Sequence, residues 1–222
     1  MEAEEHDYRA SVMWRICAAL IAGDRESAEA IARTEYPFTG KRPEQMRPAM
    51  PPIVTGGIVV TRDRREPRGY NEADKTRVFM RDGFLDRYSG QRLVSPAVLR
   101  LLSRLLPDEF PCHPHGKMEA THAAHWELFP VIDHFEPIAG GGQNIESNWV
   151  TTSATRNLWK SNWSTEERGW VLHPIEANLR QWDGLTGWFV AYIDRYPDQL
   201  RHLYLRRWHK ASVPHKSELA VW

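Results

Sequence analysis

The chain has 222 residues, of which 41% are hydrophobic and 26% charged, a composition that indicates a folded globular protein rather than a disordered or fibrous one. No apolar run is long enough to cross a bilayer, and the acidic start MEAEEHDYRA lacks the features of a secretory signal, so we expect a cytoplasmic protein with no membrane partner. The two cysteines, Cys17 and Cys112, lie far apart and form no CxxC pair, which argues against a disulfide framework and excludes a zinc ribbon built from cysteines.

The formal net charge of zero hides an uneven distribution of charge along the chain. Residues 41–104 hold 14 basic and 7 acidic residues, whereas residues 105–150 hold 1 basic and 7 acidic residues. Binding to a nucleic-acid backbone needs local Lys and Arg rather than a high net charge, so a basic segment beside an acidic centre suits phosphate contacts around a cation site. Solvated charged faces would give the same pattern, and charge alone does not decide between the two.

The first third of the chain predicts two helices and a linker. Residues 8–36 suit two helices, because Val12, Ile16 and Leu20 share one face and Asp24 can cap the second segment. Five prolines make residues 37–52 an extended linker. After it we expect a strand with an internal glycine pair over residues 53–61 and an exposed loop over residues 62–75.

The rest of the chain predicts short strands and short helices. Pro96 can open a helix that ends before Pro107. Two strands joined by turns are expected over residues 76–94, and two more strands over 126–132 and 148–153. Helices are expected over residues 154–163, 185–196 and 198–210.

Residues 131–160, VIDHFEPIAGGGQNIESNWVTTSATRNLWK, contain the side chains with the most specific chemistry. Asp133 and His134 end an apolar run, a glycine-rich loop follows, Asn148 opens the next strand, and Asn157 lies in the expected helix. Hydrolysis of a phosphodiester needs a base for water and positive charge for the phosphate and the leaving oxygen. A histidine can be the base, and a hard cation on oxygen ligands can supply the charge. The set therefore suits a one-metal phosphodiester hydrolase.

Three further side chains in this stretch could assist. Asn148 could fix the loop by bonding its backbone, because a carboxamide both donates and accepts hydrogen bonds. Arg156 adjoins Asn157 and Lys160 follows one helical turn later, so either could bind a substrate phosphate. The alternatives are a plain turn residue for Asn148 and exposed helix charges for Arg156 and Lys160.

Taken in order, these residues resemble the HNH nucleases, a branch of the ββα-metal (His-Me finger) group. The matching pattern is Asp133-His134, Pro137, Gly141-Gly142, Asn148, and Asn157 with Lys160. The last asparagine, in place of a histidine, resembles the variant in the HNH domain of CRISPR effector nucleases. The resemblance implies that His134 is the general base, that Asp133 and Asn157 bind one divalent cation, Mg²⁺ or Mn²⁺, and that Asn148 supports the catalytic loop.

Residues 81–90, RDGFLDRYSG, resemble the RDxYxCxxCG segment of many HNH proteins. Asp86 and Ser89 stand where those relatives have cysteines, so we expect no structural zinc here and side-chain packing in its place. A second cluster, Cys112, His113, His115, His122 and His125, matches no zinc spacing and suits an ordinary loop.

We therefore expect an α+β fold, with a central ββα-metal HNH unit and additional helices at the N- and C-termini. The expected divisions are a helical segment with its linker (1–52), a nuclease core (53–165) and a helical extension (166–222). The expected function is metal-dependent endonuclease cleavage of DNA, with RNA and a homodimer left open. The alternative is a non-catalytic module on a degenerate ββα scaffold that binds nucleic acid or a partner, as the missing cysteines and zero net charge would allow.

Overall fold

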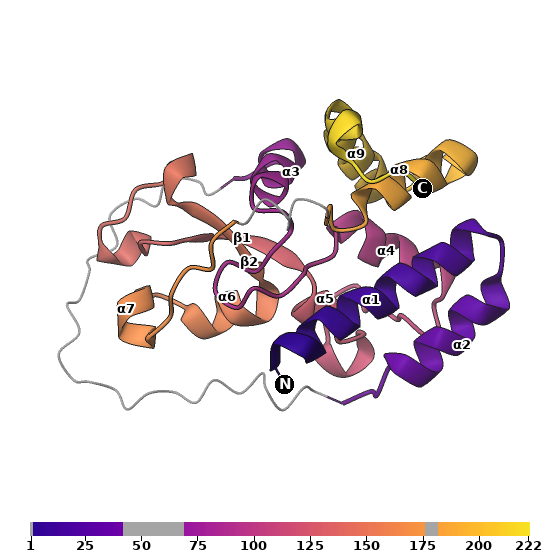
Figure 1. The fold of residues 1–222 in the computed structure, drawn as a ribbon, viewed down its shortest axis with the longest axis horizontal. Coiled ribbons are helices and arrows are strands. Elements are labelled where there is room, and N and C mark those ends of the chain that lie inside the picture. Colours follow the sequence, from indigo (N-terminus) through magenta and orange to yellow (C-terminus); the bar gives the residue numbers. More distant parts are fainter. Residues whose placement is uncertain (1, 42–68, 176–181) are drawn as a thin grey trace.

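The computed structural model describes residues 2–41, 69–175 and 182–222, with side chains from residue 7 onward. The expected strand over 53–61 and most of the expected linker lie outside these ranges. The described residues form helices around one two-stranded antiparallel sheet, which confirms the α+β class (Figure 1). No helix among them has both the length and the apolar character that crossing a membrane requires.

The N-terminal helices lie side by side, as Figure 1 shows in indigo. They are α1 (Glu2–Ile21) and α2 (Arg25–Glu35). The predicted cap is present, because the Asp24 carboxylate accepts a hydrogen bond from the Ser27 backbone N–H at 3.0 Å. Val12 and Ile16 are fully buried, so the apolar face predicted for the first helix packs on the core.

A helix, α3 (Glu72–Arg81), occupies the last four residues of the expected loop, 72–75, and the start of the first expected strand, while residues 62–68 of that loop lie outside the described ranges. The prediction of two strands over 76–94 is wrong, because after α3 only one isolated bridge, between Leu85 and Arg92, remains. A capping box starts the helix: Asn71 accepts from the Asp74 N–H at 2.9 Å while Asp74 accepts from the Asn71 N–H. Phe79 then stacks on Trp208 of α9 (Leu203–Ser212) with ring centroids 6.3 Å apart, so tertiary packing favours the helix.

The remaining helices are short. They are α4 (Pro96–Leu105), which begins at the predicted proline, α5 (Ala124–Glu127), α7 (Thr165–Arg168), α8 (Thr186–Arg195) and α9 (Leu203–Ser212). Single 3₁₀ segments lie at Met118–Ala120, Ile138–Gly140, Glu146–Asn148, Pro197–Arg201 and Val213–Glu218. The two predicted C-terminal helices are confirmed as α8 and α9.

The sheet and the helix after it form a strand–loop–strand–helix unit. Strand β1 (Pro130–His134) pairs antiparallel with β2 (Trp149–Ser153), so that His134 lies opposite Trp149 and Asp133 opposite Val150. Helix α6 (Ala154–Lys160) follows β2 directly, and its N-cap Ser153 accepts from the Arg156 N–H at 3.2 Å. Both α3 and α6 pack against the two strands, so the short sheet lies between helices from distant parts of the chain (Figure 1).

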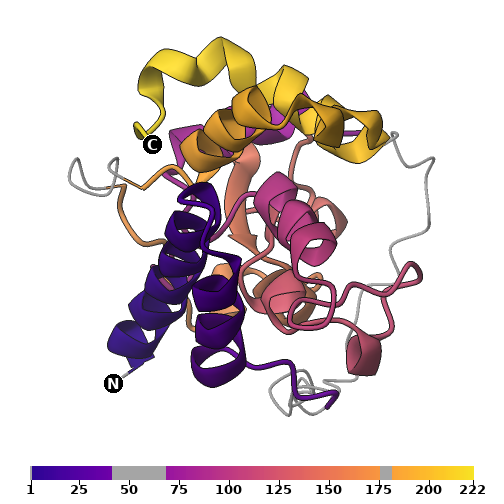
Figure 2. The same ribbon diagram turned by 90° about the vertical axis from the view of Figure 1, so that its right-hand side faces the viewer.

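The main core lies beside this unit, where α1, α2, α4, α8 and α9 come together (Figure 2). His122 connects the N-terminal helices to this core. The Ala124 N–H donates to His122 Nδ1 at 3.1 Å, so the ring hydrogen is on Nε2 and is donated to the Tyr36 carbonyl oxygen at 2.8 Å. Tyr36 donates in turn to Glu127, which also pairs with Arg9.

Burial of His122 predicts a pH-dependent stability. Desolvation lowers the pKa of His122 from 6.5 to about 4, so between these values the unfolded chain binds more protons than the folded protein. Stability is lost as the pH falls through this window, by about 2 kcal/mol from His122 between pH 7 and pH 5. The free energy of unfolding of the wild type and of His122→Gln is measured in urea at both pH values. The difference between the two proteins in how this free energy changes with pH is the contribution of His122. His115→Gln, at an exposed position, should keep the wild-type dependence, and an unchanged dependence in His122→Gln would contradict the assignment.

Candidate functional site

His134 is the last residue of β1 and is 7% exposed. Its Nε2 lies 2.9 Å from Asn144 Oδ1 and 3.0 Å from the Tyr70 hydroxyl. Tyr70 precedes α3 and Asn144 lies in the loop between the strands, so three separate segments meet at this ring. A histidine held in this way at a strand end is positioned to act as a base if one ring nitrogen is unprotonated.

Asp133 is held by a different set of contacts. Its Oδ2 accepts from the Tyr88 hydroxyl at 2.7 Å and pairs with the Lys160 ammonium at 2.9 Å. Lys160 also donates to the His134 carbonyl oxygen at 2.8 Å. Burial and the neighbouring carboxylate raise the pKa of Tyr88, so its hydroxyl stays protonated and remains a donor to Asp133.

Lys160 does not lie where the sequence prediction needs it. The prediction was a substrate phosphate contact, but the Lys160 side chain is 0% exposed and its ammonium is paired inside the protein. The reason is its position in the last turn of α6, which packs on β1 and directs the side chain inward. Lys160 is therefore an internal counterion of Asp133.

Arg156 is likewise engaged by the protein itself. Its Nε lies 3.5 Å from Asp86 Oδ2, and its guanidinium lies 5.8 Å from the Trp159 ring centroid and 5.4 Å from that of Trp170. The side chain is 21% exposed. These contacts give Arg156 a packing role, and its predicted phosphate contact stays a prediction.

Asn157 lies three residues before Lys160 on α6, so both side chains lie toward the same face of that helix. Its half-buried carboxamide makes no hydrogen bond within the described residues, and the same holds for the second carboxylate oxygen of Asp133, Oδ1. One carboxylate oxygen and one amide oxygen suit a hard cation such as Mg²⁺, which keeps several waters. Within the described ranges, this site and the Cys112–His125 segment included, no group of three or more His, Cys, Asp or Glu residues could hold a metal ion.

Asn148 bonds the backbone of the loop between the strands. Its Oδ1 accepts from the Glu136 N–H at 2.8 Å, and its Nδ2 donates to the carbonyl oxygens of Glu136 and Gln143, both at 2.9 Å. The predicted hydrogen bonds to the loop backbone are therefore present. The loop also needs glycine at position 142, because a Cβ there would lie 2.0 Å from the Glu136 carbonyl oxygen.

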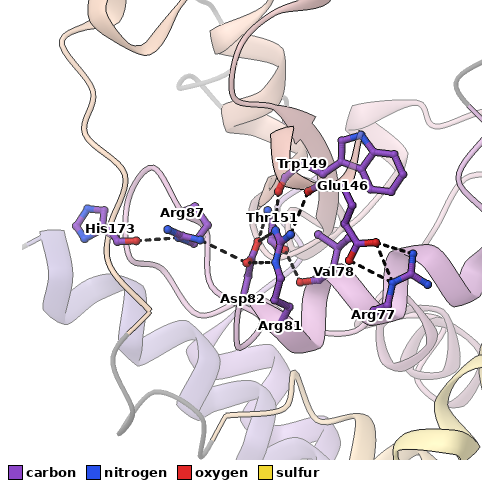
Figure 3. A network of polar contacts seen from close by, with 9 residues as sticks. All are labelled: Arg77, Val78, Arg81, Asp82, Arg87, Glu146, Trp149, Thr151 and His173. Atoms are coloured by element: carbon purple, nitrogen blue, oxygen red, sulfur yellow. Dashed lines mark hydrogen bonds and ion pairs between the residues drawn. The ribbon is translucent and has the colours of Figure 1, made fainter. Parts of the chain in front are cut away.

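Two buried carboxylates attach the turn after α3 to strand β2. The first is Asp82, at the centre of the network in Figure 3. It accepts from Arg81 at 2.9 and 3.1 Å, from Arg87 at 3.4 Å and from the Thr151 N–H at 2.8 Å. Since Asp82 is fully buried, these donors replace the water that its charge loses on folding.

The second is Asp86. In the HNH proteins that residues 81–90 resemble, a cysteine occupies the corresponding position. Its Oδ1 accepts from the Tyr88 N–H and the Thr152 hydroxyl, both at 3.0 Å. Its Oδ2 accepts from the Ser153 N–H at 3.0 Å. A hydrogen-bonded carboxylate thus fastens this turn to the end of β2, directly before α6.

The sequence prediction missed three residues that contact Asp133 or His134: Tyr70, Tyr88 and Asn144. Tyr70 and Tyr88 lie 64 and 45 residues from their partners, so no local pattern could reveal them. Asn144 lies two residues after Gly142 in the loop between the strands, and its polar side chain near a candidate base was the one available signal.

The Lys160–Asp133 pair predicts a large effect on stability. Lys160→Met would leave the Asp133 carboxylate buried without its cation, and we expect a loss of about 3–5 kcal/mol in the free energy of unfolding. The double variant Asp133→Asn/Lys160→Met should recover part of this loss, because the uncompensated charge is gone. Lys210→Met, on the exposed face of α9, is the matched control and should change stability by less than about 0.5 kcal/mol. A Lys160→Met protein as stable as this control would contradict the internal role of Lys160.

The Asp86 network predicts a second effect. Asp86→Ala leaves three buried donors without an acceptor, so we expect a loss on the order of 3 kcal/mol or more in urea unfolding. Asp198→Ala makes the same chemical change at a side chain that is 82% exposed and should have little effect. Equal stabilities of the two variants would show that Asp86 does not fasten the turn.

Comparisons of the chain with protein-family models, with curated proteins and with solved structures found no match. The residues and contacts described above are therefore the observations from which a function can be argued. The most informative of them is that β1, β2 and α6 place a histidine, a carboxylate and a carboxamide that no described residue bonds in one small unit.

Proposed function

We propose that this protein is a metal-dependent endonuclease of the HNH type, which hydrolyses phosphodiester bonds in DNA. The observation that supports this most is the strand–loop–strand–helix unit, with Asp133 and His134 ending the first strand and Asn157 on the helix. The buried Lys160 supports it further, because its bonds to Asp133 and to the His134 carbonyl join that helix to that strand end.

In this proposal His134 is the general base. It removes a proton from a water molecule, whose oxygen then attacks phosphorus as the bond to the 3′ oxygen breaks. The 3′ oxygen leaves with the bonding electron pair and takes a proton from solvent water. The products carry a 5′-phosphate and a 3′-hydroxyl, as the resemblance implies. Asn148 contributes by holding the loop beside the base through its three backbone hydrogen bonds.

Asp133 Oδ1 and the Asn157 amide oxygen would hold one divalent cation, Mg²⁺ or Mn²⁺. Such an ion, when bound, supplies positive charge to the phosphate and to the leaving oxygen. The protein fixes the carboxylate for this task, because Tyr88 and Lys160 both bond Oδ2 and leave Oδ1 without a protein donor among the described residues. The carboxylate is thereby oriented before any ion arrives.

The choice of DNA as substrate rests on the resemblance and on the distribution of charge. The solvent face of α9 carries Arg206, Arg207 and Lys210, which are exposed and make no ion pair within the described part of the chain. Such cations favour a polyanion, since each contact with a phosphate releases a counterion. One site per chain would cut both strands most directly in a homodimer, which we include in the proposal.

The test is cleavage of supercoiled plasmid DNA by the purified protein with Mg²⁺ or Mn²⁺ and with EDTA. We expect nicking or linearisation that EDTA abolishes and that falls by about 10²–10⁴-fold in His134→Ala, the typical contribution of a general base. His115→Ala, which removes an exposed histidine, should cleave at the wild-type rate.

Two outcomes would contradict this function. Cleavage that survives in His134→Ala would place the chemistry elsewhere. No cleavage by the wild type, together with DNA binding that His134→Ala leaves intact, would favour the non-catalytic binding module.

A further inference from the structure

The Asn144 carboxamide oxygen is the meeting point of three polar groups. The indole Nε1 of Trp149 lies 3.2 Å from Asn144 Oδ1, the Tyr70 hydroxyl 3.2 Å and His134 Nε2 2.9 Å. The three come from β2, from the segment before α3 and from the end of β1. None of the three contacts involves the loop backbone, so Asn144 differs from Asn148, whose three hydrogen bonds all go to it.

The indole fixes which atom of the carboxamide faces the other groups. An indole N–H can only donate, so the Asn144 atom opposite it must be the oxygen and not the nitrogen. The sheet itself places this indole, because Trp149 pairs with His134 across the two strands. Tyr70 packs edge-on against the Trp149 ring with centroids 4.7 Å apart, and this contact also restrains the indole.

The orientation of the carboxamide then fixes the tautomer of His134. A carbonyl oxygen accepts hydrogen bonds, so His134 Nε2 at 2.9 Å must carry the ring hydrogen. The Tyr70 hydroxyl is compatible with this assignment, because it donates to Asn144 Oδ1 and its oxygen, 3.0 Å from Nε2, can share the one Nε2 hydrogen with Asn144. The lone pair of the neutral ring is therefore on Nδ1, which makes no hydrogen bond within the described residues.

We propose that Asn144 is a positioning residue that holds His134 as the Nε2–H tautomer and so presents Nδ1 as the basic atom. The catalytic part of this inference rests on the proposed nuclease function, whereas the tautomer does not. When Nδ1 takes the proton of the attacking water, the ring becomes a cation and its Nε2–H keeps its bond to Asn144 Oδ1. That bond strengthens as the charge forms, since hydrogen bonds from charged donors are the stronger ones.

The experiment is ¹⁵N NMR of the full chain labelled at histidine, in EDTA and at a pH where the ring is neutral. The His134 signals are identified by their loss in His134→Ala. We expect the wild type to show a ring protonated on Nε2 and unprotonated on Nδ1. Asn144→Asp keeps an oxygen acceptor and should keep this tautomer, whereas Asn144→Leu should give a mixture of tautomers.

Cleavage is measured on the same proteins. Loss of a group that orients a functional side chain typically costs 10–100-fold, so Asn144→Leu should lower kcat by about that factor with little change in KM. Asn144→Asp should keep most of the rate. Gln143→Leu is the matched control: it removes an exposed carboxamide from the adjacent position and should change neither the tautomer nor the rate.

The outcomes separate the two proposals. A wild-type ring protonated on Nδ1 would overturn the inference even if the protein cleaves DNA, and the wild-type spectrum gives this answer even if Asn144→Leu fails to fold. An unchanged tautomer and rate in a folded Asn144→Leu protein would also overturn it. The expected tautomer in a protein that does not cleave would support the tautomer assignment while overturning its catalytic role together with the proposed nuclease function.

Discussion

The arrangement of the site depends on one buried cation. The Lys160 ammonium, with no exposed surface, bonds the Asp133 carboxylate and the His134 carbonyl oxygen and so fixes the last turn of α6 on the end of β1. An unpaired buried charge is costly, so these two contacts favour the position of α6 on β1 that keeps them. The Asp133 carboxylate contacts Lys160 of α6 and Tyr88, whereas the His134 ring contacts Tyr70, beside α3.

Buried, hydrogen-bonded charges also hold the other strand, β2, where two carboxylates join a turn to the strand as a bound metal ion could. Asp82 and Asp86 are fully buried and accept hydrogen bonds from consecutive parts of β2. Each carboxylate offers two oxygens to several N–H donors, so it can join a turn to a strand much as a coordinated ion would. Two buried carboxylates thus attach the turn after α3 to strand β2.

What the sequence could predict depended on how local the determining contacts are. Strand β2, helix α6 and the bonds of Asn148 follow from neighbouring residues and were predicted. Helix α3 was missed because Val78 and Phe79 favour a strand locally, although the Asn71–Asp74 capping box was readable. The burial of Lys160 was not predictable, since a lysine on a short helix is usually exposed and its partner lies 27 positions away along the chain.

Asp133 and His134 are adjacent in sequence but are held by contacts of different physical character. The Asp133 contacts involve buried charges, so the main effect of losing them is a lower free energy of unfolding. The His134 contacts are hydrogen bonds to the uncharged side chains of Tyr70 and Asn144, each with a net contribution of about 1 kcal/mol, so their loss changes the orientation of the ring more than the stability of the fold. The orientation of the His134 ring can therefore change through Tyr70, Asn144 and Trp149 without weakening the Asp133–Lys160 ion pair.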